Sequence, residues 1–358
     1  MPSPNNRAVV ACAGSGKTTS LVQLALANRD RRIAIVTYTH FNMKEISARF
    51  DKINSGIPRH VDVMTWYTFL LRECARPYQR AKYARRIESI YFVSERSAKG
   101  VPEERTARYY FTKGDYIYSD KLSQFVIQCE EKSSSAVTQR LEQIYTDIFI
   151  DEFQDLAGWD LEVVERLMQS GIRVTLVGDP RQHIYSTNSS AKNKQYLGTE
   201  VINLLRKWEK RGLCSVEQMN DTYRCNAEIC KFSNALWPNL APMVPKQDET
   251  TGHDGVFLVS PKFVRDYLTN FGPQVLRYNR RAESYGAEAM NFGLAKGLQF
   301  DRVLIVPTTP ISKYLATGTL GEKPGFRDRL HVAVTRARYS VAFIYDGTSP
   351  VVAARWKP

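Results

Sequence analysis

Residues 8–20 combine an apolar run with a loop suited to binding phosphate. The run "AVVAC" leads into "AGSGKTTS", so that residues 11–18 have the spacing of a phosphate-binding loop between a strand and a helix. The Thr18 hydroxyl is a candidate Mg²⁺ ligand. The residues expected to contact the phosphates through backbone N–H groups or charge are Ala13, Gly14, Ser15, Gly16 and Lys17. The pattern predicts a nucleoside triphosphate site.

A pair of acidic residues follows another apolar run, in "IFIDEFQD". Asp151, at the end of the run, is suited to holding Mg²⁺ through water. Glu152 is suited to orienting and deprotonating an attacking water. An acidic helix start would explain Asp155, but it does not explain two carboxylates directly after four apolar residues. The pair therefore predicts hydrolysis of the bound triphosphate as well as binding.

Three further polar side chains are candidates for contacts with the γ-phosphate. Gln182 follows the apolar run in "VTLVGDPRQ". Arg224 lies in "NDTYRCNAEI" and Arg336 in "HVAVTRARYS". Phosphoryl transfer needs more positive charge than one lysine supplies, which makes the two arginines candidates. If both reach the nucleotide from the second half of the chain, ATP would close a cleft between the halves.

The elements that must position these residues form a repeated strand, loop and helix pattern. In the first half, the expected strands are 8–12, 32–39, 148–151 and 174–179. In the second half, they are 255–259, 273–278, 302–307 and 339–345. This order is typical of parallel α/β sheets that bind ligands at the carboxyl ends of their strands. We expect two similar α/β domains.

Residues 71–142 interrupt the first α/β unit with a different composition. From residue 72 to 113 there are 11 Lys and Arg against 5 Asp and Glu, interleaved with seven aromatic residues from Tyr78 to Phe111. We predict a small, mostly helical insertion with a basic face. The expected domains are residues 1–70 with 143–212, the insertion 71–142, and residues 213–358.

Overall composition points to a soluble protein that binds a polyanion. The chain has 50 Lys and Arg against 37 Asp and Glu, a net charge of +13, which favours nucleic acid as the partner. No apolar run approaches the length of a membrane helix, and the start "MPSPNNRAVV" does not resemble a signal peptide, so we expect a cytoplasmic location and no membrane partner. The 6 cysteines lack metal-site spacing and are expected to be buried thiols.

Eight segments in order resemble motifs I, Ia, Ib, II, III, IV, V and VI of the UvrD/Rep/PcrA type of superfamily 1 DNA helicases. They are "ACAGSGKT", "VTYTHFNMKEISARF", "MTWYTFL", "IFIDEFQD", "GDPRQHIY", "NDTYRCNAEI", "LAKGLQFDRVLIV" and "LHVAVTRAR". The resemblance spans residues 11–338. It implies an α/β fold with two RecA-like P-loop domains, ATP and Mg²⁺ between them, and single-stranded DNA bound across both.

The resemblance assigns roles to individual positions. It implies that Lys17, Thr18, Asp151, Glu152, Gln182, Arg224 and Arg336 carry out hydrolysis, and that Tyr223 stacks on the adenine. The positions in motifs that line the DNA path are Tyr38, His40, Thr65, Trp66, Tyr67, Tyr185 and Lys296. Trp66 and Tyr67 are equally suited to packing the edge of the sheet, and that alternative stays open here.

The chain also departs from the family pattern. Ten residues precede Ala11, and in place of the family's adenine-reading glutamine they offer Asn5 and Asn6. Thr19 replaces an arginine that sandwiches the base, and Gln299 replaces an acidic residue that touches the ribose. We therefore expect relaxed base specificity.

In motif III, "STNSS" places Thr187 and Asn188 where the family has an aromatic residue and an arginine. The large insertion of the second domain is also missing, since about ten residues separate Arg281 from Gly293. We expect weaker contacts with DNA and a compact form of the helicase.

Three functions remain open at this point. The first is an ATPase that single-stranded DNA stimulates and that translocates along it or unwinds duplexes. The second is an ATP-dependent sensor or regulatory subunit of a partner such as a nuclease, as in antiviral defence. The third is a compact RNA helicase of the viral superfamily 1 kind, although "DEFQD", "AKGLQFD" and "VAVTRAR" favour the DNA family.

Overall fold

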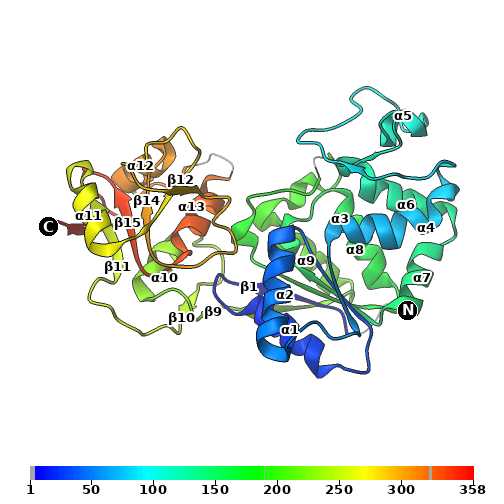
Figure 1. Ribbon diagram of the computed structural model, residues 1–358, viewed down its shortest axis with the longest axis horizontal. Coiled ribbons are helices and arrows are strands. Elements are labelled where there is room, and N and C mark those ends of the chain that lie inside the picture. The colour runs from blue at the N-terminus through cyan, green and yellow to red at the C-terminus, as the bar shows by residue number, and fades with distance from the viewer. Residues whose placement is uncertain (1–4, 189, 322–324) are drawn as a thin grey trace. The chain divides into compact units, whose positions relative to one another are not determined.

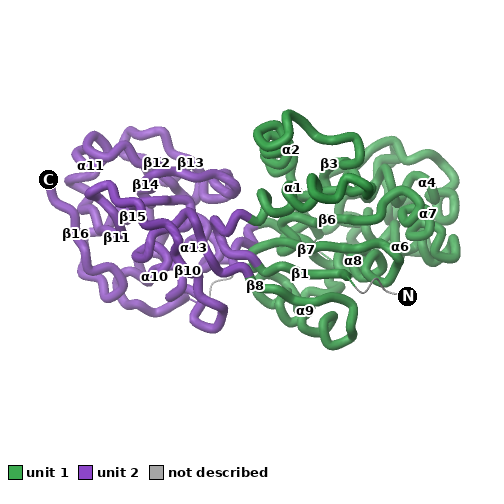
Figure 2. The backbone as a smooth tube through the Cα atoms, turned by 90° about the horizontal axis from the view of Figure 1, so that it is seen from below, with its two compact units in different colours: residues 1–10, 17–180, 185–218 green, residues 11–16, 181–184, 219–358 purple. Residues whose placement is uncertain are grey.

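The chain forms two compact units, drawn in green and purple in Figure 2. The computed structural model describes residues 5–188, 190–321 and 325–358. The first unit comprises residues 1–10, 17–180 and 185–218, and the second comprises residues 11–16, 181–184 and 219–358. Two short segments that lie within the sequence of the predicted first domain, 11–16 and 181–184, are therefore grouped with the second unit.

A six-stranded sheet forms the centre of the first unit, with the strand order β3-β2-β6-β7-β1-β8. The pairs from β3 to β1 are parallel. The strands are β1 (Arg7–Ala11), β2 (Ile33–Thr37), β3 (Val61–Thr65), β6 (Asp147–Asp151), β7 (Arg173–Gly178) and β8 (Ser215–Met219). The four strands predicted in the first half correspond to β1, β2, β6 and β7, which confirms that prediction.

Helices cover both faces of this sheet. On one face, alternate strand residues such as Val10 and Ile150 share a core with α8 (Trp159–Gln169) and α9 (Val201–Lys210). On the other face, Leu24 of α1 (Lys17–Ala27) lines the same cavity as Phe149 of β6. Figure 1 shows α2 (His40–Asn54) beside α1. Successive strand residues point to opposite faces, and strands such as β2 and β6 are buried along their whole length. Apolar side chains therefore lie on both faces of the sheet.

The predicted insertion contains short helices, loops and a two-stranded sheet. Its elements, with the helix that precedes it and the 3-10 and π-helical turns, are α3 (Trp66–Phe69), η1 (Leu70–Ala75), α4 (Arg76–Tyr78), η2 (Gln79–Ala81), β4 (Ile90–Tyr91), α5 (Thr106–Tyr110), β5 (Ile117–Tyr118), η3 (Ser119–Lys121), α6 (Leu122–Lys132) and α7 (Ala136–Ile144). Its segment before α6 is less helical than expected. Tyr83, Tyr110 and Phe111 of this segment are buried in the core that also contains the strands of the first sheet.

The second unit contains a six-stranded sheet with the order β13-β12-β14-β15-β11-β16, and its pairs are parallel. The strands are β11 (Gly255–Val259), β12 (Gln274–Arg277), β13 (Ala289–Asn291), β14 (Phe300–Ile305), β15 (Ala337–Ile344) and β16 (Ala354–Trp356). A smaller parallel pair joins β9 (Asp221–Thr222) to β10 (Val244–Pro245). The four strands predicted in the second half correspond to β11, β12, β14 and β15.

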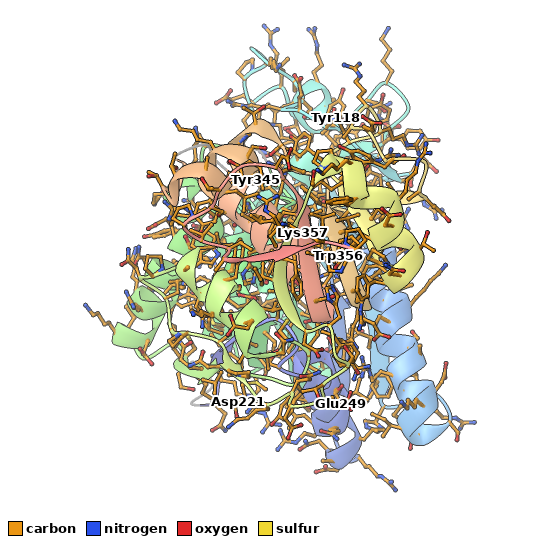
Figure 3. The ribbon with its side chains drawn as sticks, turned by 90° about the vertical axis from the view of Figure 1, so that its left-hand side faces the viewer. Tyr118, Asp221, Glu249, Tyr345, Trp356 and Lys357 are labelled. Atoms are coloured by element: carbon orange, nitrogen blue, oxygen red, sulfur yellow. The ribbon has the colours of Figure 1, made fainter. Side chains whose placement is uncertain are left out.

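Two hydrophobic clusters lie on this second sheet. One joins Val303 and Phe343 to α10 (Ala227–Ala235), α12 (Thr309–Thr317) and α13 (Phe326–Val334). The other joins Leu304 and Ala342 to α11 (Val264–Phe271). Trp356, labelled in Figure 3, packs edge-on against Phe271 at a centroid distance of 5.7 Å and so covers the end of this second cluster.

None of the helices in residues 5–188, 190–321 and 325–358 has the length and apolar character that crossing a membrane requires. All 6 cysteines are buried free thiols, as their spacing predicted.

Candidate active site

The phosphate loop connects the end of β1 to the start of α1. Gly14 and Gly16 have φ angles of +75° and +82°, a region that side chains other than glycine rarely adopt. A Cβ on Gly14 would also lie 2.5 Å from the Cβ of Arg224 and 2.6 Å from the Thr222 hydroxyl oxygen. Glycine is therefore required at position 14 both for its backbone conformation and for close approach.

Backbone hydrogen bonds hold the first part of this loop within the second unit. The Cys12 N–H donates to the Met219 carbonyl oxygen at 2.9 Å, and the Tyr223 N–H donates to the Gly14 carbonyl oxygen at 3.0 Å. Loop residues 12–14 are thus fixed against the segment that carries Tyr223 and Arg224. The Ser15 hydroxyl oxygen is buried and, within the described ranges, has no hydrogen-bond partner.

Lys17 and Glu152 form an ion pair in the first unit. The Lys17 Nζ lies 3.2 Å from the Glu152 Oε1, with side-chain exposures of 14% and 10%. Glu152 follows β6 directly and has a φ of +58°, in the left-handed region that is unfavourable for residues other than glycine. The chain therefore turns sharply after Asp151, and the carboxylate of Glu152 is held beside the phosphate-loop lysine.

Asp151 carries a buried carboxylate oxygen suited to a cation. Its side chain lies in the core at the end of β6, and its Oδ1 has no hydrogen-bond partner among the described residues. Burial and the neighbouring Glu152 carboxylate raise the pKa of Asp151, while Lys17 opposes the rise. A buried carboxylate oxygen left in this state fits a Mg²⁺ ion, for which Thr18 at the start of α1 would supply a second oxygen.

Gln154 links the acidic pair to the end of β7. Its side-chain amide donates to the Glu152 carboxylate and accepts from the Asp179 N–H at 3.0 Å. A Cβ on Gly178 would overlap the Gln154 amide oxygen, so glycine is needed there. Gln154 had no predicted role from the sequence. Its position in "DEFQD", two residues after Glu152, was the available signal.

The second unit brings Gln182 and Arg336 together. The Arg336 side chain is 2% exposed, and its Nη2 donates to the Gln182 Oε1 at 3.2 Å. Its Nε donates to the Val332 carbonyl oxygen at 3.1 Å and its Nη1 to the Leu298 carbonyl oxygen at 3.2 Å. Each of the three guanidinium nitrogens therefore donates to a different acceptor, which fixes the orientation of the group.

Arg224 lies in the same unit and contacts Gln299. Its Nε donates to the Gln299 Oε1 at 3.1 Å, and its Nη1 donates to the Thr335 carbonyl oxygen at 3.1 Å. Thr335 precedes Arg336, so the two predicted arginines are held by adjacent parts of the chain. The Gln299 side chain, which the resemblance assigns to the ribose, orients Arg224 in this structure.

The residues predicted to surround the nucleotide base have different environments. The Tyr223 ring is 64% exposed, as a stacking surface requires. Thr19 is partly exposed in the first turn of α1. Asn6 is buried, donates to the Met168 and Leu213 carbonyl oxygens and accepts from the Val174 N–H. Because it lies at the amino end of β1, away from the phosphate loop, Asn6 is a structural residue and not a reader of the base.

Two neighbouring residues predicted for the nucleic-acid path, Thr65 and Trp66, have structural contacts. The Thr65 hydroxyl caps α3 by accepting from the Thr68 N–H at 3.2 Å. Trp66 is 1% exposed, and its Nε1 donates to the Asp160 carboxylate at 2.8 Å. Two roles were left open for Trp66, and its burial and hydrogen bond support packing at the edge of the sheet.

Tyr67 and Tyr38 lie close together. The Tyr67 hydroxyl donates to the Thr187 carbonyl oxygen at 2.7 Å, and the Tyr38 and Tyr67 ring centroids are 6.1 Å apart. Elsewhere, His40 is exposed at the start of α2, and the Tyr185 ring is 38% exposed. Lys296, in the second unit, is 9% exposed.

The altered end of motif III belongs to a buried polar network around Asp160. The Asp160 carboxylate accepts from the Trp66 indole, the Ser123 hydroxyl and the Thr187 hydroxyl. The Thr187 N–H donates to the Asp155 carbonyl oxygen at 3.0 Å, which ties this network to "DEFQD". Burial raises the pKa of Asp160, while these hydrogen bonds oppose the rise. Thr187 thus has a structural role at the position where the family places an aromatic residue.

The Thr187→Val substitution tests this network. We expect it to lower the free energy of unfolding by about 1–3 kcal/mol, because it leaves buried partners of the hydroxyl without a hydrogen bond while preserving the side-chain shape. Thr187→Ser is the matched control and should lose less, since it keeps the hydroxyl. Urea titrations of the three proteins measure the difference. Wild-type stability in Thr187→Val would show that the hydroxyl contributes nothing.

Comparison with known proteins agrees with these motifs. The family model described as the UvrD/REP helicase N-terminal domain matches residues 71–200. This range contains the insertion, "IFIDEFQD" and "GDPRQHIY". The resemblance to UvrD-type superfamily 1 helicases is confirmed. Among curated proteins, no sequence matches this chain significantly.

The chain is also similar in fold to solved helicase structures. The crystal structure of Arterivirus nonstructural protein 10 (helicase) has a TM-score of 0.50 at 16% sequence identity, covering 97% of this chain and 61% of that one. A complex of the same Arterivirus protein with DNA has a TM-score of 0.49 at 17% identity, covering 96% and 61%. The chain thus spans 61% of the length of these structures. The first likeness confirms the predicted fold class, two RecA-like domains with parallel sheets flanked by helices.

Proposed function

We propose that this protein is an ATP hydrolase of the UvrD/Rep helicase type whose activity is stimulated by single-stranded nucleic acid. The observation that carries the proposal is the ion pair of Lys17 and Glu152, with 3.2 Å between Nζ and Oε1, next to the buried Asp151 oxygen that has no partner in the described ranges. A match to the UvrD/REP helicase family supports a helicase or NTPase function in general terms.

Each residue of the phosphate-loop side has a proposed role. Lys17 binds the β- and γ-phosphates of ATP, and backbone N–H groups of the loop surround them. Thr18 and Asp151 would hold Mg²⁺, which neutralises charge on the phosphates when it is bound. Glu152 orients the attacking water and accepts its proton, which requires that Lys17 exchange its ion pair for the phosphates. Gln154 positions the Glu152 carboxylate.

The second-unit residues would stabilise the charge that develops during hydrolysis. Arg336 and Arg224 supply guanidinium donors, and Gln182 and Gln299 orient them through the bonds at 3.2 Å and 3.1 Å. Tyr223 offers a stacking face to the base, without a side chain identified as specific for adenine. We further propose that binding and hydrolysis change the relative position of the two units, as in other superfamily 1 enzymes that the motifs resemble.

Single-stranded DNA is the proposed nucleic acid. The net charge of +13 supports a polyanionic partner. Tyr38, His40, Tyr67 and Tyr185 are the proposed contacts in the first unit and Lys296 in the second, and we assign Trp66 and Thr65 to packing and capping.

ATP hydrolysis should be measured with single-stranded DNA, duplex DNA and RNA of the same sequence. We expect the steepest rise with single-stranded DNA, followed by strand displacement on a tailed duplex. Activation by RNA alone would replace DNA with RNA as the substrate. An ATPase that no nucleic acid stimulates would contradict the proposal and favour the regulatory-subunit alternative.

A further inference from the structure

Three aromatic rings form a continuous series in the first unit. The Tyr38 and Tyr67 centroids are 6.1 Å apart, and the Tyr67 and Phe92 centroids are 5.2 Å apart with perpendicular ring planes. Tyr38 follows β2 and Tyr67 follows β3, at the carboxyl edge of the first sheet, whereas Phe92 follows β4 in the insertion. The series therefore leads from the motifs at the sheet edge onto the insertion.

Phe92 is an exposed aromatic ring on a fixed backbone. Its side chain is 66% exposed. On its amino-terminal side, Tyr91 pairs with Tyr118 of β5, and on its carboxyl-terminal side the Val93 N–H donates to the Ser119 hydroxyl oxygen at 3.1 Å. The edge contact with Tyr67 leaves much of the Phe92 surface uncovered. A large apolar ring held in this way has an open surface for a planar ligand.

The middle ring of the series is itself held in place. The Tyr67 hydroxyl donates to the Thr187 carbonyl oxygen at 2.7 Å, and the same threonine is bound to Asp155 of "DEFQD". Two residues, Tyr67 and Thr187, thus link Phe92 to Asp155 of the acidic motif.

We propose that the exposed face of Phe92 is a stacking subsite for one unpaired base of a single-stranded nucleic acid. This inference rests on the proposed function and extends the nucleic-acid path beyond the motifs to a residue of the insertion. Any base can stack on an aromatic face, so binding at this subsite would not depend on the nucleotide sequence. The charge of the segment that carries Phe92 also favours this occupant, because residues 72–113 contain 11 Lys and Arg against 5 Asp and Glu.

A partner protein is the alternative occupant of an exposed phenylalanine. The excess of positive charge in the same segment favours a polyanion over an apolar protein surface. The neighbouring ring pair, in which Tyr91 contacts Tyr118 edge-on at 6.0 Å, is separate from the series that ends on Phe92. The subsite is therefore assigned to Phe92 alone.

Phe92→Ala in the full chain tests the subsite by fluorescence anisotropy with a labelled oligothymidylate. We expect about 5- to 150-fold weaker binding, the loss of one stacked base. Phe92→Trp should restore binding because it keeps an aromatic face. Tyr116→Ala is the matched control, since it removes a 43% exposed aromatic of the same insertion, and it should bind as the wild type does. ATP hydrolysis without nucleic acid should be equal in all four proteins.

A second probe separates stacking from charge. On an oligonucleotide of the same length that contains abasic sites only, the wild type and Phe92→Ala should bind equally. Two results would show that the stacking subsite is wrong while the proposed function stands. In the first, the wild type binds oligothymidylate and Phe92→Ala binds it within twofold of the wild type. In the second, Phe92→Ala weakens binding of the abasic oligonucleotide as much as it weakens binding of oligothymidylate. If the wild type binds no nucleic acid, the proposed function itself fails. Loss of a bound protein partner with nucleic-acid affinity unchanged would also overturn the subsite.

Discussion

Glu152→Gln is expected to lower the rate of ATP hydrolysis by about 10²- to 10⁴-fold, the contribution of a general base. The amide preserves the size of the side chain and keeps one oxygen that can accept from Lys17 or from Gln154, but it cannot take the proton of the attacking water. ATP affinity should change little, because the carboxylate does not bind the phosphates directly. Turnover in the presence of single-stranded DNA and binding of a fluorescent ATP analogue measure the two effects.

Glu95→Gln is the control for that substitution. Glu95 is 79% exposed and pairs with Lys99 on the surface of the insertion. The Glu95→Gln substitution therefore removes the same charge from the chain without changing Asp151 or Glu152. It should hydrolyse ATP at the wild-type rate. Wild-type turnover in Glu152→Gln would mean that another group activates the water. An equal loss in both variants would point to an effect of net charge.

Arg336→Lys is expected to lower the rate of hydrolysis by about 10³-fold or more, within the range found for arginines that stabilise the transferred phosphoryl group. Lysine keeps the positive charge, but one ammonium cannot reproduce the three directed bonds of the guanidinium to Gln182, Val332 and Leu298. Steady-state turnover gives the magnitude, and ATP binding should be affected less than turnover.

The neighbouring Arg338→Lys serves as the control. Arg338 lies two residues further along, in β15, is 29% exposed and pairs with Glu249 at 3.0 Å and with Asp301 at 3.5 Å, so it tests a partly exposed neighbouring arginine. We expect near-normal hydrolysis from it. Because Arg336 is buried, thermal unfolding of both variants must accompany the kinetics. A folded Arg336→Lys protein that retains full turnover would exclude a role for the guanidinium in the reaction.

The sequence predicted four of the six strands in each sheet, because each of these is a short apolar run ended by polar or small residues, but it did not predict β3, β8, β13 and β16. The runs at 148–151 and 302–307 correspond to β6 and β14 within a few residues. The insertion was harder to predict. Its composition predicted a small, mostly helical insertion with a basic face, but Tyr83 and Phe111 are buried in the core shared with the first sheet. Which core an aromatic side chain enters depends on long-range packing, which local composition does not contain.

The altered motif III shows a similar limit. The sequence shows that Thr187 and Asn188 replace an aromatic residue and an arginine, and we predicted weaker nucleic-acid contacts from that loss alone. In the structure, Thr187 is 4% exposed and bonds to Asp160, Asp155 and, through its carbonyl, Tyr67. The substitution therefore also creates contacts. They were not predictable because Asp160 and Tyr67 are distant from Thr187 along the chain.

The sequence by itself predicted a site for binding and hydrolysing a nucleoside triphosphate. The order of "AGSGKT", "DEFQD" and the later motifs predicted the phosphate loop, the acidic pair and the family, because each motif depends on close spacing along one strand-to-helix turn. The tertiary structure alone decided the partners of each side chain: Asn6 secures the start of β1, Gln299 orients Arg224, and Phe92 meets Tyr67. Such contacts join residues far apart in sequence, so they depend on how strands and helices pack and not on local spacing.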